Sequence, residues 1–130
     1  MYTSVHRSPV SYAHLFRWAA RAGAIIVVLA WLALVLMEAV RSRFEPPSVD
    51  TYYQAASLAI VFAGYLIGWW KEPTGGVIAI LGTMSFFAVH ALTLGMLPGL
   101  AAAWFAAPGV LYLLAWQAEH VGGRQLTRSP

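Results

Sequence analysis

The chain has 130 residues, of which 60% are hydrophobic and 10% are charged, and its mean hydropathy is +0.67. Soluble domains carry roughly 25% charged residues, so the composition excludes a soluble globular domain and indicates an integral membrane protein. The formal charge of +3, with no basic patch interleaved with aromatic residues, argues against nucleic-acid binding. Because the chain has no cysteine, disulfides, thiolate chemistry and cysteine-ligated metals are excluded.

The first apolar run extends from Ala22 to Met37 and follows a basic segment over residues 1–17. Together with the residues that flank it, this run predicts a membrane-spanning helix over about 18–40, since a spanning helix needs roughly 20 residues. A basic flank before an apolar run is also typical of a signal peptide. We favour a retained helix, because the end of the run, Met37-Glu38-Ala39, is a poor cleavage site.

Three more spans are predicted after this helix, at about 52–70, 74–95 and 100–117, followed by a polar tail over 118–130 that we expect to be frayed. The Pro46-Pro47 pair separates the first two spans, since proline pairs stop helices. Pro108 lies inside the fourth span and predicts a kink there, because proline frees a backbone carbonyl.

The turn between the second and third spans is the sequence Trp69-Trp70-Lys71-Glu72-Pro73-Thr74-Gly75-Gly76. Its tryptophans suit the headgroup level of a bilayer, and Lys71 and Glu72 suit water. Pro73 supplies the φ angle favoured at the first position of a helix. The sequence therefore predicts an all-α four-helix bundle with up-down topology, in which two hairpins are joined by this tight turn.

Basic residues in short loops predict the orientation of the bundle. With four spans, one side carries the basic residues Arg7, Arg17, Arg21, Lys71, Arg124 and Arg128, and the other side carries Arg41 and Arg43. The larger group should be cytoplasmic, which predicts a multi-pass protein of the bacterial inner membrane with both termini in the cytoplasm. Trp18, Trp69, Trp70 and Trp116 all fall at the same predicted boundary.

Small residues are expected where helices approach closely in a membrane. The packing candidates are Gly64, Gly68, Gly75, Gly76 and Gly82, together with the alanine stripe Ala55, Ala59 and Ala63. We expect these faces to pack within one chain. The alternative is a homodimer formed through one of them.

The pattern Trp69-x-x-Glu72-x-x-Gly75-Gly76, opening an apolar helix that contains Gly82, resembles the turn of a family of small bacterial four-span proteins of unknown function, one of the DUF-type families. Members carry an acidic residue near the end of the first span, where this chain has Glu38. The resemblance covers about three spans and implies an architecture but no activity. Where members often have a His-Leu-x-Pro-like segment, this chain has Ser57-Leu58-Ala59-Ile60.

Three polar residues, Glu38, Gln54 and His90, lie at similar predicted depth in the outer half of the spans. An ionisable side chain at mid-membrane costs at least about 2.5 kcal/mol, so it suggests a function. In the first interpretation, Glu38 contacts Arg41 or Ser42 on its own helix, and His90 bonds to the backbone or to a neighbouring threonine. In the second, Glu38 and His90 form a titrating pair or line a polar cavity.

A second cluster is predicted at the cytoplasmic boundary and comprises Arg17, Arg21, Trp69, Lys71 and Glu72. The simpler interpretation is an interfacial ion pair, with Glu72 also capping the third helix. The other is a binding site for a lipid headgroup, because basic and aromatic residues at this level suit anionic lipids.

Cofactor and catalytic sites are not predicted. His90 has no histidine at matching depth for a bis-histidine haem, and no clustered ligands indicate a metal site. We therefore expect no cofactor and no enzyme. The preferred function is a structural or accessory membrane protein that associates with itself or with a larger complex. The alternative is a small transporter or channel-like protein that uses Glu38 and His90.

Overall fold

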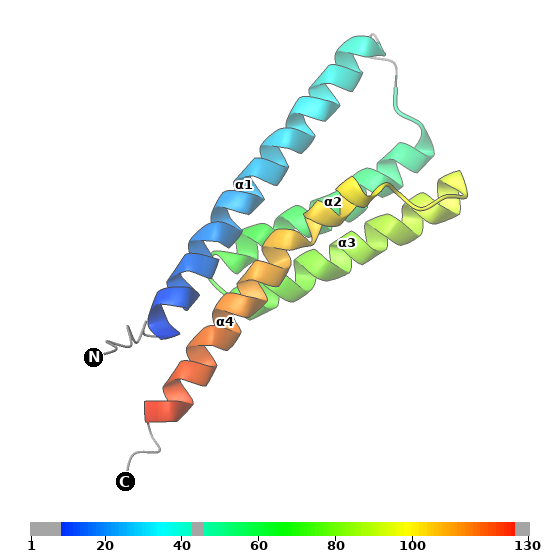
Figure 1. Cartoon of the computed structure of the whole chain (residues 1–130). Coiled ribbons are helices and arrows are strands. Elements are labelled where there is room, and N and C mark those ends of the chain that lie inside the picture. Colours follow the sequence, from blue (N-terminus) through cyan, green and yellow to red (C-terminus); the bar gives the residue numbers. More distant parts are fainter. Residues whose placement is uncertain (1–8, 43–45, 127–130) are drawn as a thin grey trace.

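The computed structural model describes residues 9–42 and 46–126. Its elements are α1 (Pro9–Arg41), α2 (Val49–Gly68), α3 (Glu72–Leu94), the 3₁₀ helix η1 (Leu100–Phe105) and α4 (Ala107–Leu126). The helices run alternately up and down, and the two ends of the chain lie at the same end of the bundle (Figure 1). The predicted all-α four-helix bundle is confirmed.

The helices pack in the order α1, α4, α3 and α2. The most extensive contact joins α2 to α3, the next joins α1 to α4, and a third joins α3 to α4. Contact between α1 and α2 is slight, and α1 diverges from α2 and α3 towards its C-terminal end (Figure 1). The bundle is therefore open on the side between α1 and α2.

Two helices are longer than the predicted spans. α1 begins at Pro9 rather than near residue 18, and proline is well tolerated in the first turn of a helix. α4 continues to Leu126, so most of the tail that we expected to be frayed is helical. Apolar content predicts the part of a helix that lies in lipid, whereas the helix itself extends into the interface. The basic residues Arg7, Arg43 and Arg128 lie outside the described residues.

The ends of α2 and α3 follow local rules. The Ser48 hydroxyl accepts a hydrogen bond from the Thr51 N–H (3.4 Å) at the start of α2, immediately after the proline pair. Pro73 lies in the first turn of α3, as predicted. α3 ends at Gly95, whose φ of 69° is the left-handed conformation that glycine adopts without strain, and whose N–H donates to the Ala91 carbonyl (3.0 Å).

The fourth span changes from a 3₁₀ helix to an α-helix just before Pro108. η1 ends at Phe105, and α4 starts at Ala107, so Pro108 lies in the first turn of α4, where no helical N–H is lost. The Tyr65 hydroxyl of α2 donates to the Phe105 carbonyl (2.5 Å). A side chain of a neighbouring helix thus satisfies a carbonyl at the junction, which a membrane interior requires.

Three of the candidate packing glycines lie on the contact line between α2 and α3. A Cβ on Gly64 would lie 2.5 Å from the backbone nitrogen of Ala79, and one on Gly82 would lie 2.7 Å from a backbone nitrogen of α2. A Cβ on Gly75 would overlap the backbone of Gly68. The backbones of the two helices therefore approach as closely as glycine allows.

Two further glycines, Gly76 of α3 and Gly68 of α2, lie against α4. A Cβ on Gly76 would lie 2.7 Å from the Gly109 carbonyl oxygen, and one on Gly68 would lie 2.6 Å from the ring of Tyr112, which is fully buried. The alanine stripe of α2, by contrast, is exposed: Ala55, Ala59 and Ala63 all face outwards. The small residues that pack within the chain are thus the glycines and not this stripe.

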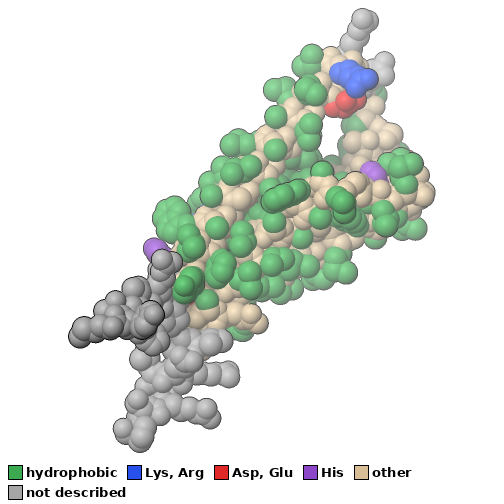
Figure 2. Space-filling view, viewed as in Figure 1, with side chains coloured by type: hydrophobic (Ala, Val, Ile, Leu, Met, Phe, Trp, Pro, Cys, Tyr) green, Lys and Arg blue, Asp and Glu red, His purple; other side chains and the backbone are tan. Residues whose placement is uncertain are grey.

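Within the described ranges, three segments are long and apolar enough to cross a membrane: Tyr12–Arg41, Glu72–Leu94 and Leu100–His120. Figure 2 shows hydrophobic side chains along the length of the bundle on the face in view, and an acidic and a basic side chain near the far end of α1. These features indicate a multi-pass membrane protein.

Candidate functional site

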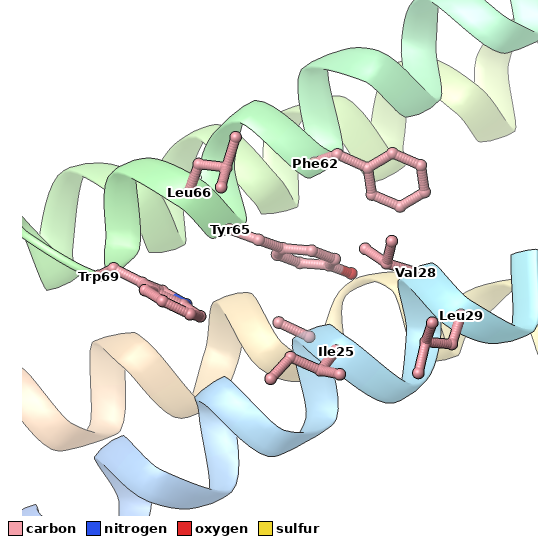
Figure 3. Close-up of a pocket in the computed structure, with 8 residues that line it drawn as sticks. Ile25, Val28, Leu29, Phe62, Tyr65, Leu66 and Trp69 are labelled. Carbon is pink, nitrogen blue, oxygen red and sulfur yellow. The ribbon is translucent and has the colours of Figure 1, made fainter. Parts of the chain in front are cut away.

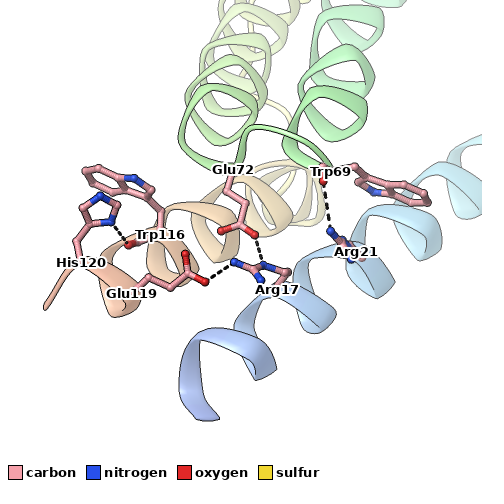
Figure 4. Close-up of polar contacts among 7 residues, drawn as sticks. All are labelled: Arg17, Arg21, Trp69, Glu72, Trp116, Glu119 and His120. Carbon is pink, nitrogen blue, oxygen red and sulfur yellow. Dashed lines mark hydrogen bonds and ion pairs between the residues drawn. The ribbon is translucent and has the colours of Figure 1, made fainter. Parts of the chain in front are cut away.

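The guanidinium of Arg17 joins three helices at the end of the bundle that carries the chain termini (Figure 4). Its Nε donates to the Glu72 carboxylate, and its Nη2 donates to the Glu119 carboxylate (2.5 Å). The side chains of Arg17 and Glu72 are 26% and 12% exposed, whereas that of Glu119 is 46% exposed. The pair with Glu72 is the better shielded from water and should contribute more to stability.

The positions of these groups follow from the helix ends. Glu72 is the first residue of α3, where a carboxylate is favoured by the positive end of the helix dipole. α1 and α4 are antiparallel neighbours, so Arg17 near the start of α1 lies level with Glu119 near the end of α4. No side-chain hydrogen bond caps α3 at its N-cap residue Lys71. The ion pair expected for Glu72 is present, with Arg17 as its partner, and capping of α3 by Glu72 stays a prediction.

Arg21, one helical turn after Arg17, is held by the C-terminal end of α2. Its Nη2 donates to the Trp69 carbonyl (3.3 Å), one of the carbonyls that a helix end leaves without a partner. Its guanidinium lies 5.9 Å from the ring centroids of both Trp18 and Trp69, within the range of cation–π attraction. Its Nε is buried and has no hydrogen-bond partner among the described residues.

These groups surround an open hollow of about 470 Å³, here called the polar cleft. It is lined by Arg17, Arg21, Trp69, Trp70, Lys71, Glu72, Pro73, Thr74, Trp116 and Glu119. All five residues predicted for the cytoplasmic cluster are in this lining. Three cations and two carboxylates face the cleft, and both carboxylates contact Arg17.

Two contributors to this region, Glu119 and His120, were missed because the tail after residue 117 was not expected to be helical. α4 continues through both, and Glu119 follows Trp116 by three residues, which places the two on one helix face. The His120 Nδ1 lies 2.9 Å from the Trp116 carbonyl oxygen, and the two rings lie 4.4 Å apart (Figure 4). An acid beside a boundary tryptophan is the sequence signal that would have found Glu119.

The outer-half residues are placed differently. Glu38 is exposed near the end of α1, Gln54 is half-buried on α2, and His90 is half-buried on α3. The His90 ring lies 5.9 Å from the Phe86 ring, and its Nδ1 is buried with no hydrogen-bond partner among the described residues. No hydrogen bond or ion pair in the described part of the chain joins Glu38 to His90. The structure does not bring these two side chains together.

Polar groups within the spans mostly bond to their own helices. The Thr83 and Thr93 hydroxyls donate to the carbonyls four residues earlier, at 2.9 and 3.0 Å. The Ser57 hydroxyl donates to the Tyr53 carbonyl (3.1 Å) and lies 3.4 Å from the Ser85 hydroxyl. No group of three His, Asp or Glu side chains that could hold a metal occurs over the described ranges.

Replacing Arg17 with glutamine should lower the unfolding free energy in detergent by about 2 kcal/mol, because two partly shielded carboxylates lose their shared cation. Arg41→Gln is the matched control, since it removes the same charge from the other end of α1. Adding Glu72→Gln to Arg17→Gln should restore about half of the loss. Equal thermal unfolding of Arg17→Gln and Arg41→Gln would show that the pair does not hold the helices together.

The sequence model of a domain of unknown function, DUF7670, matches residues 9–126. No curated protein and no solved structure matches the chain. The expectation of a family without known activity agrees with this match, whereas the turn motif stays a prediction. The match extends over nearly the whole chain, and the protein therefore belongs to the DUF7670 family.

Proposed function

We propose that the protein is a non-enzymatic accessory protein of the bacterial cytoplasmic membrane, which crosses the bilayer four times and associates with a second membrane helix through the outer part of α1. The observation that carries the proposal is the lack of packing along that part of α1.

The crossing by α2 is supported by its length and its neighbour. Its 20 residues span about 30 Å, the thickness of the hydrocarbon layer. It is antiparallel to α3, its most extensive contact, and only three residues, 69–71, join the two helices. A helix in close contact with a membrane-spanning partner shares its depth.

The orientation is supported by the distribution of charge at the helix ends. Arg17, Arg21 and Lys71 line the polar cleft at the end that carries the termini, whereas the described basic residue at the opposite end is Arg41. By the positive-inside rule, this distribution supports a cytoplasmic location of the cleft.

The outer arm of α1, residues 32–41, extends beyond its packing partners. A Cβ on Gly23 would lie 3.7 Å from Pro108, so the first turn of α4 is already level with residue 23 of α1. The last inter-helix aromatic contact of α1 is Trp31 with Phe62, at 5.2 Å. The arm is about 15 Å long.

Every side chain from Leu32 to Glu38 is exposed, whichever way it faces. A helix of a bundle normally covers one apolar stripe against its neighbours. Leu34, Leu36 and Met37 are 63%, 65% and 69% exposed, so no neighbouring helix covers the apolar side chains of the arm. A second copy of this arm would cover it, and assembly through α1 would account for a helix longer than its own bundle needs.

Disulfide cross-linking tests this association, because the chain contains no cysteine. We expect Leu36→Cys to give a disulfide-linked dimer in native membranes. Leu92→Cys, on α3 near the same end and 86% exposed, is the control for random collision. Equal yields from both variants would remove the arm as an interface, and adducts of Leu36→Cys with other proteins alone would favour a larger complex over self-association.

A transporter function has less support from the structure. It requires a polar path that includes Glu38 and His90, whereas the hydroxyl groups of Ser57, Thr83 and Thr93 bond to their own helix backbones.

A further inference from the structure

A second hollow lies beside the polar cleft, on the open side of the bundle between α1 and α2 (Figure 3). This apolar groove has a volume of about 290 Å³, and its lining includes Ile25 and Leu29 of α1 and Phe62 and Leu66 of α2. Trp69 lines both the apolar groove and the polar cleft. The two hollows therefore meet at this indole.

The sequence spacing on each helix makes the two hollows parts of one surface. On α1, Arg21, Ile25 and Leu29 follow one another at intervals of four residues and share a helix face. On α2, Trp69 is followed inwards by Leu66 and Phe62, at similar intervals. From Arg21 to Leu29 the surface extends about 12 Å, close to the depth of one leaflet of a hydrocarbon layer about 30 Å thick.

The charged end of this surface has cations available to a ligand. Arg17 is occupied by the two carboxylates of the cleft. In the described part of the chain neither Arg21 nor Lys71 forms an ion pair, and the Arg21 Nε is buried without a partner. The flanking indoles of Trp18 and Trp69 hold the Arg21 guanidinium in place, and the planar set of donors on arginine matches the oxygens of a phosphate.

We propose that the polar cleft and the apolar groove together bind one anionic phospholipid. Its phosphate contacts Arg21 and Lys71, and one acyl chain lies between α1 and α2. Trp69 stands at the boundary between headgroup and chain, the level that tryptophan prefers in membranes. A soluble anion would leave the groove unused, and an uncharged lipid would leave Arg21 and Lys71 without a counter-charge.

The test uses the full chain in detergent and counts retained lipid by native mass spectrometry. The probes are phosphatidylglycerol and phosphatidylcholine with identical acyl chains. We expect the parent protein to retain at least tenfold more phosphatidylglycerol than phosphatidylcholine. Arg21→Gln combined with Lys71→Gln should abolish this preference. The control, Arg41→Gln combined with Arg43→Gln, removes the same charge from two sequence positions that lie far from the polar cleft residues and should keep the preference.

A second pair of variants tests the acyl chain. Leu29, which is 60% exposed and lines the groove, is replaced with tryptophan to fill it, and Leu92→Trp is the control on α3. Leu29→Trp should reduce phosphatidylglycerol retention at least fivefold and leave the helical circular dichroism unchanged, whereas Leu92→Trp should have no effect.

Three results would overturn the proposal. Equal retention of the two lipids by the parent would mean that the bound lipid is a non-specific annular one. Unchanged retention in the Arg21→Gln, Lys71→Gln variant would remove the headgroup site. Displacement of phosphatidylglycerol by inorganic phosphate, with no effect of Leu29→Trp, would show an anion site without an acyl chain.

Discussion

Replacing Gly75 with alanine should lower the unfolding free energy of the bundle in detergent by about 3 kcal/mol. The added methyl group would overlap the backbone of Gly68 and lie 2.6 Å from the Gly64 carbonyl oxygen. Both neighbours are helical backbone, which cannot rotate away as a side chain can. α2 and α3 must therefore separate, and the close contact at Gly64 and Gly82 would loosen with them.

Two alanine substitutions serve as controls for this measurement. Gly99 has no atom within 4 Å of the position of an added Cβ, and its φ of −59° suits alanine. At Gly23 an added Cβ would make an ordinary contact, 3.7 Å from Pro108. Thermal unfolding followed by circular dichroism should distinguish Gly75→Ala from both. If Gly75→Ala unfolded with the controls, α2 and α3 would not be packed backbone to backbone.

The helices themselves could be predicted from the sequence because their signals are local. Apolar runs of sufficient length give the spans, and the proline pair and the turn around Pro73 separate them. The order of packing could not be predicted, since it depends on which side chains meet between helices. The divergence of α1 from α2, which opens the apolar groove, is a result of that packing.

The two predicted polar clusters show the same limit. Arg17, Arg21, Trp69, Lys71 and Glu72 meet because antiparallel helices bring their ends to one level, which the sequence reveals. A contact between Glu38 and His90 was predicted only because the two residues lie at similar depth in their spans. Contact between two mid-helix residues also requires neighbouring helices and matching rotation, and α1 is packed chiefly on α4 rather than on α3.

We propose that this chain crosses the membrane four times with the polar cleft in the cytoplasm. Labelling of single cysteines tests it most directly, since the chain has none of its own. Pro47, before α2, and Thr74, in the first turn of α3, are both exposed and lie at opposite ends of the α2–α3 pair.

A membrane-impermeant maleimide should label Pro47→Cys in intact cells and Thr74→Cys only after the membrane is permeabilised. The difference should be close to all or none, because a bilayer separates the two sites. Labelling of Thr74→Cys in intact cells, or protection of Pro47→Cys until permeabilisation, would contradict the account.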